Sequence, residues 1–172
     1  MHVEQPLEFV PVSSEEHIST VVRLAAEIWP EHYRDIIGQD QVDYMLQRFQ
    51  SATAVAAQLD EGYEYFLLRM GERWVGYASV LAESQMQRLF VSKLYLLKAL
   101  RGRGLGRESV SYLSQLAHRR GLSKLWLTVN KYNPSLTAYL RMGFVNDGAV
   151  VTDIGGGYVM DDYRLEMSAL PV

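Results

Sequence analysis

The chain has 172 residues, of which 48% are hydrophobic and 22% are charged, and its formal net charge is −3. This length suits one domain with a full hydrophobic core, so we predict a single domain over residues 1–172. The acidic balance argues against nucleic acid as the main partner, because no broad basic surface is available for phosphates. The absence of cysteine excludes disulfides, thiolate metal sites and a cysteine nucleophile.

Targeting and membrane patterns are also missing from the sequence. No apolar stretch approaches the length needed to span a bilayer. The N-terminus lacks the basic segment and apolar run of a secretory signal. We therefore expect a cytoplasmic protein with no membrane partner and no bound metal.

The first third of the chain predicts a strand followed by helices. Alternating apolar and polar residues over 7–12 predict the strand. Ser13 with Glu16 three residues later is a capping box, which predicts a helix start. Pro30 is expected to end or bend that helix, and residues 31–38 are predicted to form an irregular link.

Two more helices and a hairpin are predicted next. The spacing of apolar residues predicts a helix over about 40–51 with Asp40 as N-cap, and a short helix from Ser51 to about residue 59. The β-rich segments 63–70 and 73–82 are separated by a two-residue turn, so they predict an antiparallel hairpin.

The middle of the chain predicts a βαβ unit. Residues 87–97 become continuously apolar near their end, as expected for a strand in the centre of a sheet. A helix over about 104–120 and a strand over 124–130 follow with a short connection. Such a unit has parallel strands and a right-handed crossover.

The C-terminal part predicts a short helix and a strand pair. Asn133 followed by proline is a helix start, with Asn133 as the N-cap. Strands are predicted at about 144–151 and 157–167, with a flexible loop over 153–157 between them. The order of elements predicts one α/β domain with a mixed sheet of six to seven strands and helices on both faces.

The turn between the central strand and the long helix has the composition of an anion site. Three glycines occupy alternate positions: Gly102, Gly104 and Gly106. They let the backbone approach a ligand closely, and the helix behind them offers unpaired N–H groups and a positive dipole end. Positive charge is added by three arginines: Arg101, Arg103 and Arg107. We predict that this turn binds a pyrophosphate.

Two common phosphate-binding patterns do not fit this turn. A P-loop requires a Lys-Ser/Thr pair after its last glycine, and none is present. A Rossmann fingerprint requires a third glycine, where this chain has Ser109, and an acidic residue after the next strand, which is also missing. A Rossmann-type nucleotide-binding protein is therefore disfavoured.

A third pattern does fit. Arg101-x-x-Gly104-x-Gly106 resembles the pyrophosphate motif of the GNAT superfamily of acyl-CoA-dependent N-acyltransferases. Tyr139, followed after three residues by Gly143-Phe144, resembles a second segment of that family. The order of elements also matches, so the resemblance covers nearly the whole chain and implies a sheet whose central parallel pair splays apart. Many members carry proline and an acid at the positions of Lys98 and Ala99, a departure that leaves the turn unchanged.

The resemblance implies a site for acetyl-CoA as co-substrate. Backbone groups of the central strand would hold the pantetheine arm: Leu94, Tyr95 and Leu96. The turn would wrap the pyrophosphate with Gly102, Arg103, Gly104, Leu105, Gly106 and Arg107. Asn133 would contact the cofactor arm, although a plain capping role explains it equally well.

The resemblance also assigns the general acid but leaves the base open. Tyr139 occupies the position of the family's general acid, and a phenol with a pKa near ~10 is protonated at neutral pH. The alternative is a tyrosine packed in the core. Lys93 stands where other members have an acidic residue. The candidates for the base are Glu83, Asp161, Asp162, His32 or an ordered water; Asp161 and Asp162 face opposite sides of a strand, so only one can reach a site.

The acceptor site of this family usually lies between the first two helices and the last strands. Aromatic and histidine side chains in these regions suit an amine: Trp29, His32, Tyr33, Tyr44 and Tyr158. Plain packing is the alternative for each of them. The resemblance thus implies an N-acetyltransferase acting by direct transfer on a primary amine. The acidic balance and the aromatic-rich first region favour a small cationic amine over a peptide or protein acceptor. A non-catalytic acyl-CoA-binding regulatory module is the other interpretation, and a homodimer is left open.

Overall fold

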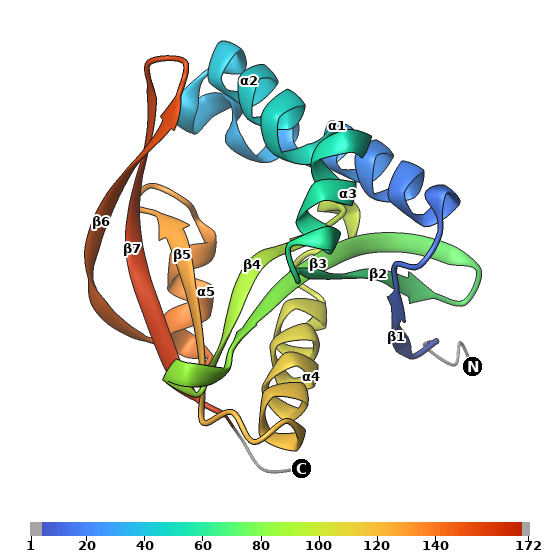
Figure 1. Cartoon of the computed structure of the whole chain (residues 1–172), viewed down its shortest axis with the longest axis vertical. Helices are drawn as coiled ribbons and strands as arrows, with labels where there is room; N and C mark the ends of the chain where they lie inside the picture. Colours follow the sequence, from blue (N-terminus) through green and yellow to red (C-terminus); the bar gives the residue numbers. More distant parts are fainter. Residues whose placement is uncertain (1–4, 170–172) are drawn as a thin grey trace.

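Seven strands form one mixed sheet in the order β1-β2-β3-β4-β5-β7-β6 (Figure 1). The structure is a computed structural model, and it describes residues 5–169. The strands are β1 (Leu7–Pro11), β2 (Glu64–Met70), β3 (Arg73–Glu83), β4 (Arg88–Leu96), β5 (Lys124–Asn130), β6 (Val145–Gly155) and β7 (Tyr158–Ser168). Every neighbouring pair is antiparallel except β4 and β5, which are parallel. The predicted hairpin and βαβ unit are therefore confirmed.

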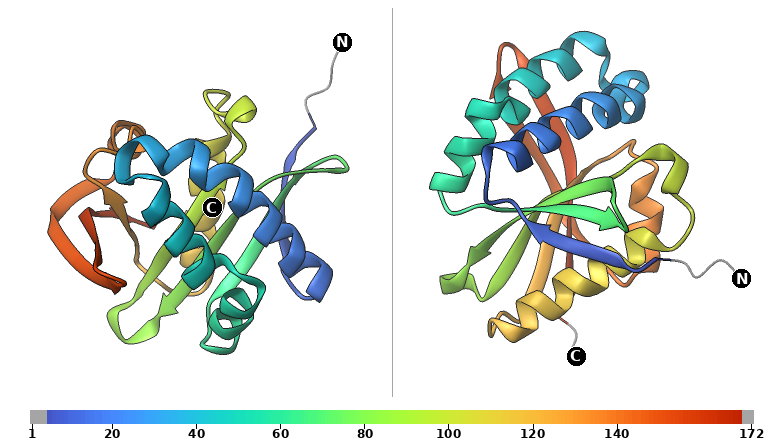
Figure 2. Two further views of the ribbon diagram at one scale, coloured as in Figure 1. Left: turned by 90° about the horizontal axis from the view of Figure 1, so that it is seen from above. Right: turned by 90° about the vertical axis from the view of Figure 1, so that its right-hand side faces the viewer.

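Helices cover both faces of this sheet (Figures 1 and 2). The helices are α1 (Glu15–Ile37), α2 (Gln39–Gln50), α3 (Ala52–Asp60), α4 (Leu105–Arg119) and α5 (Ser135–Arg141), with short 3₁₀ turns at Ser84–Met86 and Lys98–Leu100. One apolar core lies between the sheet and α1–α3, and a second lies between the sheet and α4 and α5. No helix within residues 5–169 is long and apolar enough to cross a membrane.

The central parallel pair is joined for only a short distance. β4 pairs with β5 from Arg88 to Phe90 on one strand and from Lys124 to Trp126 on the other. Beyond this seam the two strands diverge (Figure 1), while β4 stays paired with β3 and β5 stays paired with β7. The split leaves two facing edges without a ladder in the middle of the sheet, as expected from the family resemblance.

The first helix differs from its prediction at both ends. Its N-cap is Ser14, whose hydroxyl accepts a hydrogen bond from the His17 amide, and not Ser13. The helix also continues through Pro30 to Ile37, so the predicted irregular link is wrong. Proline removes one helical hydrogen bond, but Trp29 and Tyr33 lie four residues apart with their rings 5.8 Å apart. Packing of this face against the core outweighs the lost bond.

Two turns also differ from their predictions. α2 begins at Gln39 after Gly38, which has φ of +85° and makes no side-chain cap, so Asp40 is not the N-cap. The loop predicted at 153–157 is mostly strand, because β6 extends to Gly155 and only the next two glycines form the turn. α5 begins one residue later than predicted, with Pro134 at its N-cap, but Asn133 Oδ1 still caps its first turn by accepting a hydrogen bond of 2.8 Å from the Ser135 amide.

Candidate functional site

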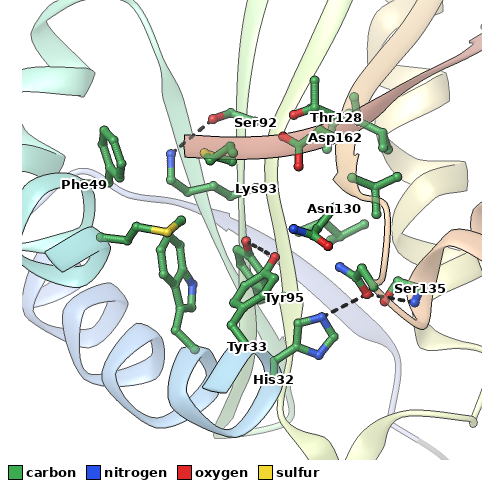
Figure 3. A pocket seen from close by; sticks show the side chains of 18 of the residues that line it. His32, Tyr33, Phe49, Ser92, Lys93, Tyr95, Thr128, Asn130, Ser135 and Asp162 are labelled. Carbon is green, nitrogen blue, oxygen red and sulfur yellow. Dashed lines mark hydrogen bonds between the residues drawn. The ribbon is translucent and has the colours of Figure 1, made fainter. Parts of the chain in front are cut away.

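The split between β4 and β5 is the centre of a large cavity. Its volume is about 1400 Å³, and its walls come from α1, α2, α3, β4, the glycine turn, β5, α5, β6 and β7 (Figure 3). Segments far apart in the sequence thus meet where the sheet opens. The cavity joins the glycine turn at one end to the α2–α3 region at the other.

The glycine turn has the backbone that an anion cradle needs. Gly102 and Gly104 have φ of +76° and +82°, a region that side-chain-bearing residues rarely adopt. Gly104 is the N-cap of α4 and supplies no side-chain cap, so the first N–H groups of the helix are left for other acceptors. Gly102, Gly104, Gly106 and Arg107 all line the cavity.

Arg101 is held by the protein itself. Its guanidinium donates two hydrogen bonds to the Glu31 carboxylate, at 2.9 and 2.7 Å, and two more to the Leu96 carbonyl, at 3.2 and 3.1 Å. The hydrogen bond from Arg101 lowers the pKa of Glu31. Arg101 therefore ties α1 to the end of β4 at the base of the turn. No signal in the sequence pointed to Glu31 as its partner.

Two predicted cofactor-binding residues have side chains that face away from this cavity. Arg103 lines a separate, smaller hollow beside Gln5 and Glu108. The side chain of Leu105 is buried in the core beneath α1–α3. Only their backbone groups remain candidates for a role in the turn.

The strand predicted to hold a cofactor arm lies along the open edge. Leu94, Tyr95 and Leu96 all line the cavity. The β4 backbone here has β3 on one side and the split on the other. An extended ligand can therefore add to this edge in the way a further strand would.

Three tyrosines from three elements converge at the split. The hydroxyls of Tyr33 in α1 and Tyr95 in β4 lie 2.9 Å apart. Tyr139 in α5 also lines the cavity, and its ring packs edge-on against Phe144. Burial raises the pKa of Tyr33 to about 12 and raises the pKa of Tyr139 as well. All three phenols are protonated at neutral pH, and within residues 5–169 no hydrogen bond engages the Tyr139 hydroxyl.

The four candidate bases separate into two groups. Glu83 accepts hydrogen bonds from Arg88 and from the Trp126 indole, and Asp161 is ion-paired with Lys131 at 2.7 Å. Neither of these two acids lines the cavity, whereas Asp162 and His32 do.

Asp162 has the properties of a poised base. It is 3% exposed, and its Oδ1 has no hydrogen-bond partner among the described residues. Burial, helped by the negative charge of Asp161, raises the pKa of Asp162 to about 6, and the Thr128 side chain opposes this shift. The carboxyl is therefore ionised at neutral pH but binds a proton more readily than a surface aspartate.

His32 is oriented by the start of α5. Its Nε2 lies 3.1 Å from Asn133 Oδ1 (Figure 3). Burial, followed by the nearby charge of Arg101, lowers the pKa of His32. The imidazole is thus neutral at neutral pH, and one of its nitrogens is engaged with the cap of α5.

The aromatic residues predicted for the acceptor site also divide into those that line the cavity and those that do not. Trp29 and Tyr33 line the cavity. Tyr44 and Tyr158 do not, because their rings pack on each other at 5.1 Å and the Tyr44 hydroxyl donates to the Ile154 carbonyl. These two are packing residues, as the alternative interpretation held.

The sequence did not identify the polar wall on the far side of the split. Thr128 and Asn130 of β5 lie on one face with Asp162 and Arg164 of β7, because these residues alternate along paired strands. All four line the cavity, together with Lys93 of β4. The period-2 pattern of the two strands was the only available signal, and it does not distinguish a cavity wall from a solvated face.

Fold and cavity define a class of protein: an α/β domain whose sheet opens beside a glycine turn at the start of a helix. The sequence model of the acetyltransferase (GNAT) family matches residues 21–144. The chain belongs to this family.

Relatives and solved structures agree with this assignment. Streptothricin acetyltransferase of Streptomyces lavendulae is 37% identical over 70 residues, which are 40% of this chain and 37% of that protein's length. A GCN5-related N-acetyltransferase from Rhodopseudomonas palustris has a TM-score of 0.80 at 17% identity, over 98% of this chain and 99% of that one. PaiA N-acetyltransferase from Thermoplasma acidophilum, solved with coenzyme A, has a TM-score of 0.72 at 16% identity, over 95% and 99%. The two structures match the fold along nearly its whole length.

Proposed function

We propose that the protein moves an acetyl group from acetyl-CoA to a primary amine of a small molecule by direct transfer. One observation carries the proposal: Tyr139 and Asp162 line a single cavity that also contains the glycine turn. The cavity thus brings together an anion site, a proton donor and a proton acceptor.

Donor binding would use the turn and the open strand edge. The N–H groups at the start of α4 and the Arg107 guanidinium suit a pyrophosphate, because oxyanions prefer N–H donors and charge-assisted bonds. The unpaired edge of β4 suits the amides of a pantetheine arm. Acetyl-CoA would supply the activated acetyl group. Arg101, fixed by Glu31, would hold the turn in place and is not available as a free cation.

Two side chains would move protons during transfer. Asp162 would accept a proton from the acceptor amine, since only a neutral amine has a lone pair to attack a carbonyl carbon. A C–N bond then forms and the C–S bond breaks, the nitrogen would release its second proton to solvent, and Tyr139 would donate a proton to the leaving sulfur. Because burial raises the pKa of the Tyr139 hydroxyl, the hydroxyl stays protonated until this step and takes a proton back from solvent afterwards.

Asp162 is the preferred base because its carboxylate is ionised above about pH 6 and its side chain lines the cavity. His32 is less suited, since burial and the nearby charge of Arg101 lower its pKa, so the imidazole binds a proton less readily. A transfer through an acylated cysteine has no candidate residue, because the chain contains no cysteine.

The acceptor class rests on two kinds of support. The partial relative is named as an acetyltransferase of streptothricin. The cavity is enclosed by helices and strands on several sides, which suits a small acceptor better than a peptide. Our expectations of a cytoplasmic location, and of a small-molecule partner without nucleic acid or membrane, remain part of this proposal.

The test is a thiol-release assay with acetyl-CoA against a panel of polyamines, amino acids, aminoglycosides and peptide N-termini, combined with calorimetric titration of CoA. We expect CoA to bind and at least one small amine to release thiol above the rate of hydrolysis. CoA binding without turnover of any amine would favour the non-catalytic module. No binding of CoA would overturn both interpretations.

A further inference from the structure

A lysine lies in the wall of the cavity without an acidic partner. Lys93 of β4 is partly exposed to the cavity, and among the described residues no carboxylate lies within ion-pairing distance of its Nζ. Burial alone lowers the pKa of Lys93 to about 8, with no charged neighbour contributing. Withdrawing an ammonium from bulk water without a counter-ion is costly, so a lysine in this position indicates a functional role.

A bulge in β4 directs this side chain into the cavity. The pairing with β3 shifts between Ser79, opposite Lys93, and Val80, opposite Val91. Ser92 is therefore an extra residue in β4. The bulge places Lys93 on the same face as Tyr95, beside the open edge (Figure 3).

Behind Lys93 a chain of neutral hydrogen bonds crosses the core. The Trp29 indole donates to the Tyr77 hydroxyl at 2.9 Å, which donates to Gln50 Oε1 at 2.6 Å. Gln50 Nε2 donates to the Tyr65 hydroxyl at 3.1 Å, which donates to Gln58 Oε1 at 2.6 Å. Because an indole can only donate, every group in the chain has one orientation.

This series of hydrogen bonds ends at Lys93, to which it presents an acceptor oxygen. Gln58 Oε1 accepts from Lys93 Nζ at 3.2 Å, and Ser92 Oγ accepts from it at 3.1 Å. Two of the three ammonium donors are thus used on neutral oxygens, and the third has no partner among the described residues. Nζ also lies 5.9 and 5.6 Å from the ring centres of Tyr63 and Tyr65. These contacts hold the ammonium in place without neutralising it.

A second cation, on the far side of the split, is also without an acidic partner among the described residues. Arg164 lies 4.9 Å above the Trp126 ring, and its buried Nε makes no hydrogen bond within residues 5–169. Asp162 stands two residues away on the same face of β7. The polar wall thus presents unneutralised positive charge as well as one carboxylate. Other charged side chains that line the cavity include Arg48, Glu61 and Asp153.

We propose that the acceptor carries a carboxylate as well as its amine, and that Lys93 binds this carboxylate through its unused N–H while Asp162 receives the amine. The proposal rests on the proposed function and narrows its substrate class to amino acids and related zwitterions. Lys93 is then a specificity residue. An amine without a carboxylate would leave the ammonium unneutralised in a desolvated site, and would bind less well.

The test compares amino acids with the amines that remain when the carboxylate is removed. The matched probes are alanine with ethylamine, phenylalanine with phenethylamine and lysine with cadaverine. For the wild-type protein we expect kcat/KM to be higher for the acid in at least one pair. Lys93→Met, which keeps the stem but not the charge, should reduce the acid-to-amine ratio of kcat/KM about 10- to 100-fold, the effect of one charge-assisted hydrogen bond. Lys93→Arg should retain most of the ratio.

A binding measurement separates failure of this proposal from failure of the proposed function. Calorimetric titration of the CoA-loaded protein with the same probes does not require turnover. Tighter binding of the acids, lost in Lys93→Met, supports the carboxylate subsite even if no amine is acetylated. If amines are acetylated but the acid-to-amine ratio is unchanged by Lys93→Met, the subsite is overturned and the acetyltransferase assignment stands. An equal fall in kcat for both members of every pair would instead give Lys93 a role in proton transfer, which also overturns the subsite.

Discussion

His32 in α1 and Asn133 at the start of α5 meet across the cavity, with His32 Nε2 3.1 Å from Asn133 Oδ1. The same oxygen accepts the Ser135 amide at 2.8 Å. Since an amide oxygen can only accept, His32 must carry its hydrogen on Nε2. One side chain thus caps a helix on one face of the sheet and orients a histidine from the other.

We expect Asn133→Ala to destabilise the protein by about 1 kcal/mol, because it removes the cap of α5, and to raise the KM for acetyl-CoA. Thermal unfolding and steady-state kinetics measure the two effects. Asn133→Asp is the matched control, since an aspartate oxygen can still cap the helix and accept from His32. An alanine variant as stable as wild type would show that the cap contributes little.

Tyr139→Phe should lower kcat by about 10²-fold or more while the affinity for CoA changes little, because it removes a proton donor and leaves the ring packing against Phe144 intact. Initial rates and calorimetry give the two values. Tyr132→Phe is the control: Tyr132 is 78% exposed and does not line the cavity, so its kcat should be unchanged. An unchanged kcat in Tyr139→Phe would remove this hydroxyl from the mechanism.

For wild type, kcat/KM should rise with pH through the pKa of Asp162, which is about 6, because only the ionised carboxyl can accept a proton. Asp162→Asn should abolish this rise, the acidic limb of the pH profile, and lower kcat by about 10²-fold. Asp161→Asn is the neighbouring control, because Asp161 lies outside the cavity and acts on Asp162 only through its charge. This variant should keep its activity, and the rise of kcat/KM should shift to slightly lower pH. A limb that persists in Asp162→Asn belongs to another group.

Asp162→Asn should also stabilise the fold at neutral pH. The folded-state pKa of Asp162 lies above its ordinary value of 3.8, so folding favours the protonated form, and stability falls as pH rises from 3.8 through about 6. Asparagine cannot ionise. With allowance for solvent screening, we expect Asp162→Asn to gain about 1–2 kcal/mol near pH 7 and nothing below the ordinary pKa. Denaturant unfolding at two pH values tests this, and a loss of stability near pH 7 would contradict it.

Gly104→Ala should weaken CoA binding by about 10-fold, because alanine at φ of +82° is strained by about 1–2 kcal/mol and the turn must shift to relieve it. An added Cβ would meet no atom within 4 Å, so the effect is conformational and not a clash. Gly121→Ala is a close control: Gly121 has φ of +72°, is equally open and lies at the far end of α4. It should lose similar stability and keep its affinity for CoA. Equal affinities in the two variants would contradict the assignment of the turn.

Much of the fold could be predicted because local patterns and tertiary packing agree. The hairpin of β2 and β3, the βαβ unit and the family were predicted from periodicity and the glycine motif, and all were confirmed. The continuation of α1 past Pro30 could not be predicted. The proline rule is local, whereas the opposing force is the burial of Trp29 beneath the sheet.

The candidate site was predictable only where a motif spans neighbouring residues. The glycine turn and Tyr139 belong to such motifs, and both lie at the cavity. Whether Asp161 or Asp162 faces inward depends on the register between β5 and β7, which no local pattern encodes. The hydrogen-bond chain behind Lys93 joins residues from α1, α2, α3, β2 and β3, so only the folded structure reveals it.

The short seam between β4 and β5 has a thermodynamic consequence. Beyond Phe90 and Trp126 the facing edges of the two strands lack each other's hydrogen bonds, so the middle of the sheet has fewer interstrand hydrogen bonds to protect it from local opening. A ligand that lies along β4 supplies the missing strand, and ligand binding is then linked to folding stability. If the donor binds along β4 as proposed, donor concentration should affect how firmly the two halves of the sheet are held together.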